Sequence, residues 1–253
     1  MLTRYRRLAN VLAGLALLVS GPAQSATVLV AVASNFNETF VALSKDFETT
    51  TGHVVKHSAA ATGVLLAQIR AGAPFEVLLS ADAEAPLQLV VEDLAVGSSR
   101  FTYARGLLVL WSANRGLVDD HGAVLTKGSF KHLAIANPKL APYGHAAMEA
   151  MASMKLSAQL ADKLVTGQSI AQAYGYVATG NAELGFVAWS QIARPGVKPD
   201  GSYWMVPSSL YGEIRQDAVL LKAGIGNPAA PAFMEYLRGE SARRIIRAYG
   251  YAI

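Results

Sequence analysis

An alternation of strand-like and helix-like segments is the feature that most constrains the fold of this chain. The apolar run at 27–33 predicts a buried strand, and the segment 37–52, with apolar residues at 40, 43 and 47, predicts a helix that ends on a glycine. Strand and helix patterns follow again at 53–58 and 62–72, and a third strand pattern lies at 75–81. This order predicts a mostly parallel sheet with helices on both of its faces.

A second group of α/β patterns lies between two long apolar runs, at 107–113 and 218–224. Its members are strands expected at 133–137 and 183–189 and helices expected at 143–154, around 157–164 and at 170–180. Only helical patterns follow the second run. We therefore predict an α/β fold of two lobes with a cleft between them, lobe I formed by residues 26–106 and 219–253 and lobe II by residues 107–218. Two lobes joined by two extended crossings form a hinge, and such a cleft usually closes on a ligand.

The first 25 residues have the pattern of a cleavable signal peptide. Arg4, Arg6 and Arg7 precede the apolar run VLAGLALLVSG, and the small residues PAQS follow it. The run is too short for a membrane-spanning helix, which needs roughly 20 residues, so we expect export. Removing these three arginines from 22 basic residues leaves 19 against 18 acidic residues, a net charge of about +1. The pI of 9.3 therefore belongs to the precursor and does not indicate binding to nucleic acid.

Several kinds of chemistry are disfavoured by the residues present. The chain has no cysteine, which excludes disulfides, thiolate metal sites and thiol nucleophiles. Its five histidines are scattered, and His53 and His57 lie in one expected strand, too far apart to share a metal ion. The motif GQSIA at 167–171 is close to the G-x-S-x-G turn of hydrolases, but its last glycine is missing and no acid and histidine are placed to serve Ser169. We expect no catalysis, no cofactor and no directly ligated metal cation.

Polar residues lie where expected strands end and the next helices begin. These carboxyl ends of the strands form the edge of an α/β sheet that borders its binding crevice. They are Ser34 and Asn35, Thr62 with Gly63, Tyr143, and Ser169 with Ile170. Taken singly, each has an ordinary explanation: Asn35 three residues before Glu38 approximates a capping box, and Ser169 is a helix cap. Together they place several helix N-termini around one cleft, with hydroxyl, amide and backbone N–H donors, which favours an anion site.

Longer motifs give the chain a resemblance to a known family. The segments ASN at 33–35, AQIRAGAPFEVLLSAD at 67–82, SRFTYARGLLVLWS at 99–112, IANPKLAPYG at 135–144, AELGFVAW at 182–189 and the final AYGYAI resemble the periplasmic molybdate-binding proteins, the substrate-binding class of ABC transporters. The similarity covers essentially all of the chain after residue 25. It implies a type II periplasmic-binding fold that holds a tetrahedral oxyanion through hydroxyls and backbone amides, without metal ligands or cationic side chains.

The resemblance also implies a set of ligand residues. These are Ser34, Asn35, Thr62, Tyr143 and Ile170, with molybdenum bound as its oxyanion. Thr62 stands where serine is more usual, and Ile170, which offers only its backbone amide, where valine is more usual. One branch of the family has a ligand tyrosine in the strand at 182–189, where this chain has Ala188. The other branch takes its tyrosine from an N-P-x-x-A-P-Y-G motif, present here at 137–144, so we assign the role to Tyr143.

The function that the resemblance implies is periplasmic binding of molybdate, and of tungstate, by a monomer. The bound oxyanion is then delivered to the permease and ATPase complex of an ABC transporter at the inner membrane, with no nucleic-acid partner. Three alternatives stay open: a sulfate- or phosphate-type oxyanion binder, a serine hydrolase built on GQSIA, and a binder of an amino acid or other carboxylate. The last normally requires an arginine clamp, which none of the junctions contains.

Overall fold

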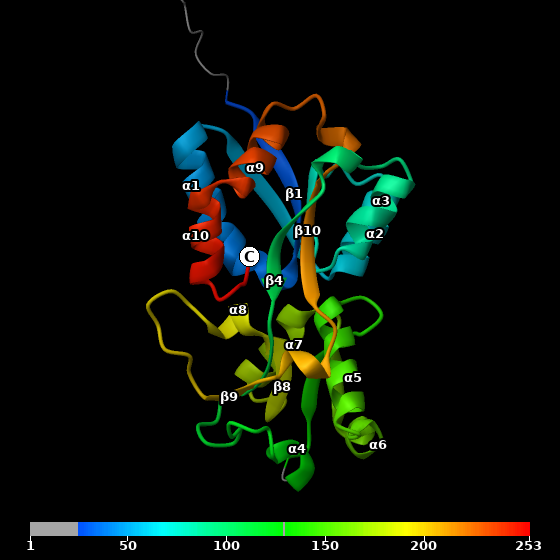
Figure 1. The fold of residues 1–253 in the computed structure, drawn as a ribbon, viewed down its shortest axis with the longest axis vertical. Helices are drawn as coiled ribbons and strands as arrows, with labels where there is room; N and C mark the ends of the chain where they lie inside the picture. Colours follow the sequence, from blue (N-terminus) through cyan, green and yellow to red (C-terminus); the bar gives the residue numbers. More distant parts are fainter. Residues whose placement is uncertain (1–24, 129) are drawn as a thin grey trace, which may run out of the picture.

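The molecule consists of two lobes, which stand one above the other in Figure 1. The computed structural model describes residues 25–128 and 130–253, so the expected signal peptide, apart from Ser25, lies outside the described residues. Each lobe contains one five-stranded sheet with helices packed against it, and the predicted two-lobed α/β fold is confirmed. No helix in the described part of the chain is long and apolar enough to cross a bilayer.

The sheet of lobe I has the order β2-β1-β3-β10-β4. Its strands are β1 (Thr27–Ala33), β2 (Val54–Ala60), β3 (Val77–Leu79), β4 (Phe101–Gly106) and β10 (Ile214–Leu220). β1 pairs in parallel with β2 and β3, whereas β10 pairs antiparallel with β3 and β4. The sheet is therefore mostly parallel, as predicted, and β10 runs against the other strands. Because Ala33 pairs with Ala60, the carboxyl ends of β1 and β2 reach the same edge.

The sheet of lobe II repeats this plan with the order β7-β6-β8-β5-β9. Its strands are β5 (Leu108–Ser112), β6 (Leu133–Ala136), β7 (Leu164–Gly167), β8 (Leu184–Ala188) and β9 (Ser202–Met205). β6 pairs in parallel with β7 and β8, and β5 pairs antiparallel with β8 and β9. The helix expected around 157–164 was wrong in its second half: the helical segment stops at Leu160, and a short 3-10 turn leads into β7.

Helices cover both sheets. Those of lobe I are α1 (Asn37–Thr51), α2 (Thr62–Arg70), α3 (Glu84–Val91), α9 (Ala229–Arg238) and α10 (Glu240–Ala248). Those of lobe II are α4 (Val124–Lys127), α5 (Pro142–Ser153), α6 (Ser157–Leu160), α7 (Ile170–Ala178) and α8 (Trp189–Ile192). Five 3-10 turns complete the described elements: η1 (Ser34–Phe36), η2 (Gly97–Ser99), η3 (Ala161–Lys163), η4 (Ser208–Leu210) and η5 (Lys222–Gly224). The glycine that ends α1 was predicted correctly, because Gly52 has a φ of 73°.

Alternate residues of β1 explain how the helices of lobe I divide between its two faces. Val30 and Val32 belong to a buried cluster with side chains of α1, α9 and α10, while Ala31 belongs to a second cluster with side chains of α2 and α3. Successive side chains of a strand point to opposite faces, so a continuous apolar run is what a strand covered on both faces requires.

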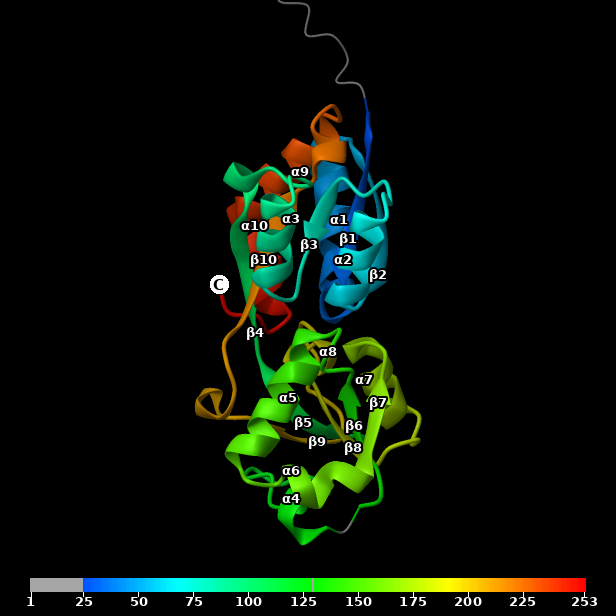
Figure 2. The same ribbon diagram turned by 90° about the vertical axis from the view of Figure 1, so that its right-hand side faces the viewer.

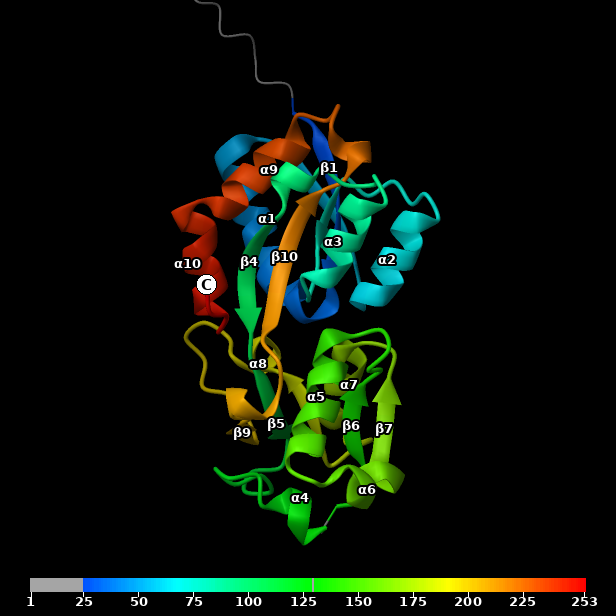
Figure 3. The same ribbon diagram turned by 45° about the vertical axis from the view of Figure 1, so that its right-hand side comes forward.

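The chain crosses between the lobes twice, along neighbouring paths (Figures 1 and 3). The first crossing is Leu107, which lies between β4 and β5, and the second runs from the end of β9 at Met205 to the start of β10 at Ile214. Residues 214–218, which we expected in lobe II, therefore pair within the sheet of lobe I. The boundary was misplaced because Gln216 and Asp217 interrupt the apolar pattern, although both side chains are buried.

Candidate functional site

The five predicted ligand residues lie where strands end and helices begin. Ser34 and Asn35 start η1 directly after β1, and Thr62 is the first residue of α2. Tyr143 is the second residue of α5, and Ile170 is the first of α7. The carboxyl ends of β6 and β7 point toward lobe I (Figures 2 and 3), so the helices that follow them begin at the boundary between the lobes.

Small side chains at the strand ends let the two lobes meet. Ala33, Ala61 and Ala81 of lobe I belong to the same buried cluster as Tyr143 and Ile170 of lobe II. The alanines at 33 and 61 stand directly before the hydroxyl residues at 34 and 62, and η1 contacts α7. The structure therefore places all five predicted residues in or beside one boundary between the lobes, which are closed on each other.

Asn35 does not cap the helix that follows it. Its Nδ2 donates to Gln216 Oε1 and to Tyr251 Oη, both at 3.0 Å, and its carbonyl accepts from Ser190 Oγ at 3.1 Å. Glu38, the other half of the expected capping box, forms a salt bridge with an arginine of lobe II. Both hydrogens of the Asn35 amide are thus used, and the donor that Asn35 can offer to a ligand is its backbone N–H in the first turn of η1.

Tyr143 is 1% exposed and presents a hydroxyl hydrogen that no described residue accepts. Its Oη accepts a hydrogen bond from Gln216 Nε2 at 3.1 Å. Burial raises the pKa of the Tyr143 hydroxyl well above its ordinary value, so the group stays protonated and can donate. A Cβ at Gly106 would overlap the Tyr143 hydroxyl, so glycine at the end of β4 makes room for it.

Thr62 is 3% exposed and keeps its own hydroxyl hydrogen for a further partner. Its Oγ1 accepts from the backbone N–H of Ala81 at 3.1 Å, which ties the start of α2 to the end of β3. The backbone N–H of Gly63 is not available to a ligand, because it donates to Leu140 O of lobe II at 2.9 Å. A Cβ on Gly63 would lie 3.2 Å from the Leu140 Cα, so glycine permits this close contact between the lobes.

Ile170 is 2% exposed at the start of α7. Ser169 caps this helix, as expected, by accepting from the Gln172 N–H at 3.3 Å. The Ile170 carbonyl accepts from Gln191 Nε2 at 3.1 Å, which holds α7 against α8. The Ile170 N–H belongs to the first turn, where the helix itself supplies no acceptor, so it is available to a ligand. The serine of the GQSIA motif therefore has a structural use as a cap.

Two hollows border the boundary between the lobes. A cavity of about 200 Å³ is lined by Ser34 and Asn35 of lobe I and by Ser169, Ser190 and Gln191 of lobe II, among others. A larger groove of about 730 Å³ lies between α2, α3 and α5. The five predicted residues are thus divided: two line the cavity, one lines the groove, and the two most buried line neither.

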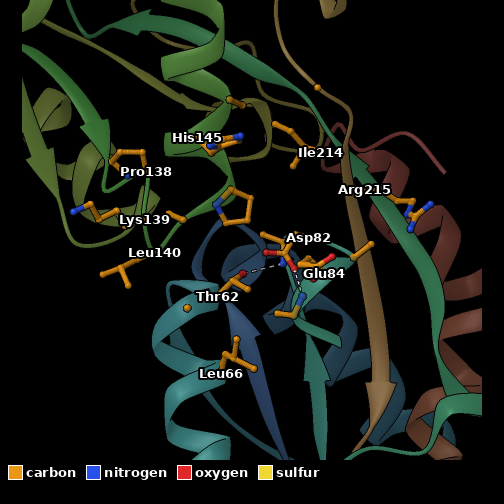
Figure 4. Close-up of a pocket in the computed structure, with 18 of the residues that line it drawn as sticks. Thr62, Leu66, Asp82, Glu84, Pro138, Lys139, Leu140, His145, Ile214 and Arg215 are labelled. Atoms are coloured by element: carbon orange, nitrogen blue, oxygen red, sulfur yellow. Dashed lines mark hydrogen bonds between the residues drawn. The ribbon is translucent and has the colours of Figure 1, made fainter. Parts of the chain in front are cut away.

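Figure 4 shows the groove, with Thr62 and its bond to the end of β3 on one wall and Pro138 and Lys139 on the other. Charged side chains of both signs line it, including Asp82, Lys139 and Arg215. Burial raises the pKa of Asp82, which accepts hydrogen bonds from Ser80 Oγ and from the backbone of α3. This mixture of charges does not make the groove a strong anion site, in contrast to the boundary beside it.

Most of the residues that line the smaller cavity are neutral, and Glu38 is the one charged residue among those described. No lysine, arginine or histidine is among the described residues that line it. The carboxylate of Glu38 forms a salt bridge with Arg194 of lobe II at 3.1 Å, and both side chains are about half exposed. Within residues 25–128 and 130–253, no group of three or more histidines and carboxylates could hold a metal ion. Such a boundary can bind an anion that accepts hydrogen bonds on all sides.

Sequence reasoning missed the residues that support these donors. Gln216, Tyr251 and Ser190 position Asn35 and Tyr143, and Gly106 makes room for the tyrosine ring. The one available signal was the pair Gln216-Asp217 inside an otherwise apolar run, because a buried polar pair in a strand needs specific partners.

Comparison with known proteins identifies the family. The family model of bacterial extracellular solute-binding proteins matches residues 28–252. The molybdate-binding protein ModA of Azotobacter vinelandii is 54% identical over 236 residues, which are 93% of this chain and 94% of that protein. The chain belongs to the ModA family. The ModA protein of Rhodobacter capsulatus is 51% identical over 230 residues, 91% of this chain and 90% of that protein.

Solved structures agree with this membership. The periplasmic molybdate-binding protein of A. vinelandii superimposes with a TM-score of 0.88 at 41% identity, over 89% of this chain and 99% of that one. The sulfate-binding protein SubI of Mycobacterium tuberculosis, with a TM-score of 0.74 and 12% identity, shares the fold alone. ModA-family proteins are periplasmic substrate-binding proteins, not enzymes, and require no cofactor, so the predicted family and non-enzymatic class are confirmed.

Proposed function

We propose that this ModA-family protein binds molybdate, and tungstate, between its two lobes for import by an ABC transporter. The observation that supports it is a set of neutral donors from both lobes at one buried boundary. Its members are the hydroxyls of Ser34, Thr62 and Tyr143 and the backbone N–H groups of Asn35 and Ile170. The named relatives, which are molybdate-binding proteins, supply the identity of the anion.

The donor set suits a fully deprotonated tetrahedral oxyanion. Each oxygen of molybdate or tungstate only accepts, and a hydrogen bond to a charged group is worth roughly 1.5–3 kcal/mol, so several together offset the desolvation of the dianion. Hydrogen phosphate carries a proton that would face another donor, which leaves a mismatch in a buried site. Sulfate satisfies the same donors, and its exclusion depends on its smaller size.

Closure of the lobes couples binding to transport. The ligand bonds to both lobes, so it stabilises the closed form relative to an open one, and we propose that the closed form docks on the permease. The protein acts as a periplasmic monomer, released from the precursor by cleavage of the signal peptide at residues 1–25. Lobe I is formed by residues 26–106 and 219–253, and lobe II by residues 107–218, except that residues 214–218 join lobe I. Delivery then requires that the permease favour reopening.

Titration calorimetry on the ligand-stripped protein, residues 26–253, tests the proposal. Molybdate and tungstate should bind tightly and sulfate and phosphate weakly. Ser34→Ala should weaken molybdate binding about tenfold or more through loss of one charged hydrogen bond. Ser44→Ala is the matched control, because among the described residues Ser44 Oγ bonds only to Phe40 O within α1. Tight sulfate binding without a response to molybdate would show that the protein is a sulfate binder.

A further inference from the structure

One buried amide joins the donors of the two lobes. Gln216, in β10, is 0% exposed. Its Oε1 accepts from Asn35 Nδ2 at 3.0 Å and lies 3.1 Å from Tyr103 Oη, while its Nε2 donates to Tyr143 Oη at 3.1 Å. Asn35 and Tyr103 belong to lobe I and Tyr143 to lobe II, so this side chain spans the boundary.

A β-bulge in the neighbouring strand β4 lies beside this side chain. The register of β10 with β4 shifts between Gln216 and Asp217. Asp217 is satisfied separately, by Arg100 at 2.6 Å and Thr102 at 2.7 Å. Gln216 pairs with Ala104 and Asp217 with Thr102, so the extra residue is Tyr103 of β4, whose hydroxyl bonds to the Gln216 amide. Successive side chains of a strand point to opposite faces, so the amide faces the boundary between the lobes while the carboxylate is held within lobe I.

The direction of the hydrogen bonds follows from the chemistry of the amide. The oxygen of Gln216 must face Asn35, because Asn35 Nδ2 can only donate. The nitrogen of Gln216 then faces Tyr143 and donates to its oxygen, which leaves the hydroxyl hydrogen of Tyr143 pointing elsewhere. We infer that Gln216 is a positioning residue, which keeps Tyr143 as a donor to the bound oxyanion and links its orientation to Asn35. This inference rests on the proposed function.

A carboxylate in place of the amide would reverse this arrangement. It would accept from both Asn35 and Tyr143, take the tyrosine hydrogen away from the ligand and place a negative charge near an anion. A protonated carboxyl group has one donor and one acceptor oxygen, so it reproduces the pattern of the amide. Burial favours the protonated form, so the change from one state to the other falls at a pH above the ordinary value of about 4.3.

The test compares Gln216→Glu and Gln216→Met with wild type by calorimetry with molybdate, between about pH 5.5 and about pH 8.5. Gln216→Met should weaken binding about tenfold at every pH, because Tyr143 loses the partner that orients it. Gln216→Glu should weaken binding about 100-fold at the high pH and recover to within about threefold of wild type at the low pH. Wild-type affinity should not change over the same range.

A double-mutant cycle separates positioning from simple charge repulsion. In a Tyr143→Phe background, Gln216→Met should lower molybdate affinity by less than a further factor of about three, because the hydroxyl that Gln216 positions is already absent. Thr102→Val is the matched control: it removes the bond to Asp217 across the bulge and should leave affinity unchanged. Additive effects in the cycle, or full affinity in both Gln216 variants, would overturn the inference while wild type still binds molybdate. Absence of binding by wild type would instead refute the proposed function.

Discussion

Gly106 offers the sharpest steric test of the site, because an added methyl group would overlap Tyr143, a proposed donor, and Gln216, which positions it. Gly106 ends β4 and does not have a positive φ, so alanine there changes contacts and not backbone strain. A Cβ at this position would overlap the Tyr143 hydroxyl and lie 2.7 Å from Gln216 Nε2 and 2.8 Å from Tyr143 Cζ. Gly106→Ala must therefore push the tyrosine ring and the amide away.

The magnitude follows from these distances. Carbon atoms in contact are about 3.5–4.0 Å apart, so the ring of Tyr143 has to move by about 0.7 Å or more. Such a shift breaks its alignment with a ligand held by several other donors, and the loss of one charged hydrogen bond weakens binding about 10- to 100-fold. Overpacking of this kind also lowers the free energy of unfolding by about 1–3 kcal/mol.

Calorimetry with molybdate measures the loss of affinity, and urea unfolding measures the loss of stability. Gly175→Ala is the matched control, because Gly175 lies within α7 and a Cβ there meets nothing within 4 Å. That variant should bind molybdate like wild type and be slightly more stable, by about 0.5–1 kcal/mol. If Gly106→Ala keeps wild-type affinity, Tyr143 does not contact the ligand in the position that the structure gives it.

Tyr143→Phe should weaken molybdate binding about tenfold or more, as calorimetry measures, because the ligand loses the hydroxyl donor. It should also lower the free energy of unfolding, measured with urea, by about 1 kcal/mol, because Gln216 Nε2 loses its acceptor. Unchanged affinity would mean that Tyr143 is a packing residue only. Glu38→Gln should weaken molybdate affinity less than about fivefold, because its salt bridge with Arg194 is half exposed, and the difference from wild type should vanish in about 1 M salt. A 100-fold loss of affinity in calorimetry would contradict this expectation. Molybdate affinity of wild type should be constant from neutral pH to about pH 9, since burial holds the pKa of Tyr143 above its ordinary value of 10. The contribution of this raised pKa to the stability of the folded state is fully present below about pH 10 and is lost above it. A fall in affinity between pH 7 and pH 9 would contradict the assignment of Tyr143 as a protonated donor.

The strands and helices of the fold could be predicted where one segment carries the whole signal. The run at 27–33 is covered on both faces, and the helix before Gly52 has its cap in the sequence, so both were correct. β7 was missed because its four residues follow a short helix without a turn signal, and the start of β10 was missed because two polar residues interrupt it. Their pairing partners, which are distant in sequence, determine both strands.

The place of the candidate residues at junctions between strands and helices could be predicted, but their hydrogen bonds could not. Junctions between strands and helices indicated Ser34, Asn35 and Thr62, because carboxyl ends of parallel strands share an edge. Nothing local showed that Asn35 uses its amide on Gln216 and not on its own helix, since the two residues lie 181 positions apart. Such long-range hydrogen bonds come from topology, which a motif of a few residues does not contain.

The hydroxyl of Tyr251 has a consequence for the order in which the molecule folds. It donates to the carbonyl of Asn35 across 216 positions of the chain, and it receives one hydrogen of the Asn35 amide in return. Closing a contact of such long sequence separation costs more chain entropy than closing a local one, so we expect it to form late. The first strand therefore cannot orient its own binding residue when it forms. Affinity for molybdate should appear last during refolding, after both sheets have formed, and so reports completion of the native structure.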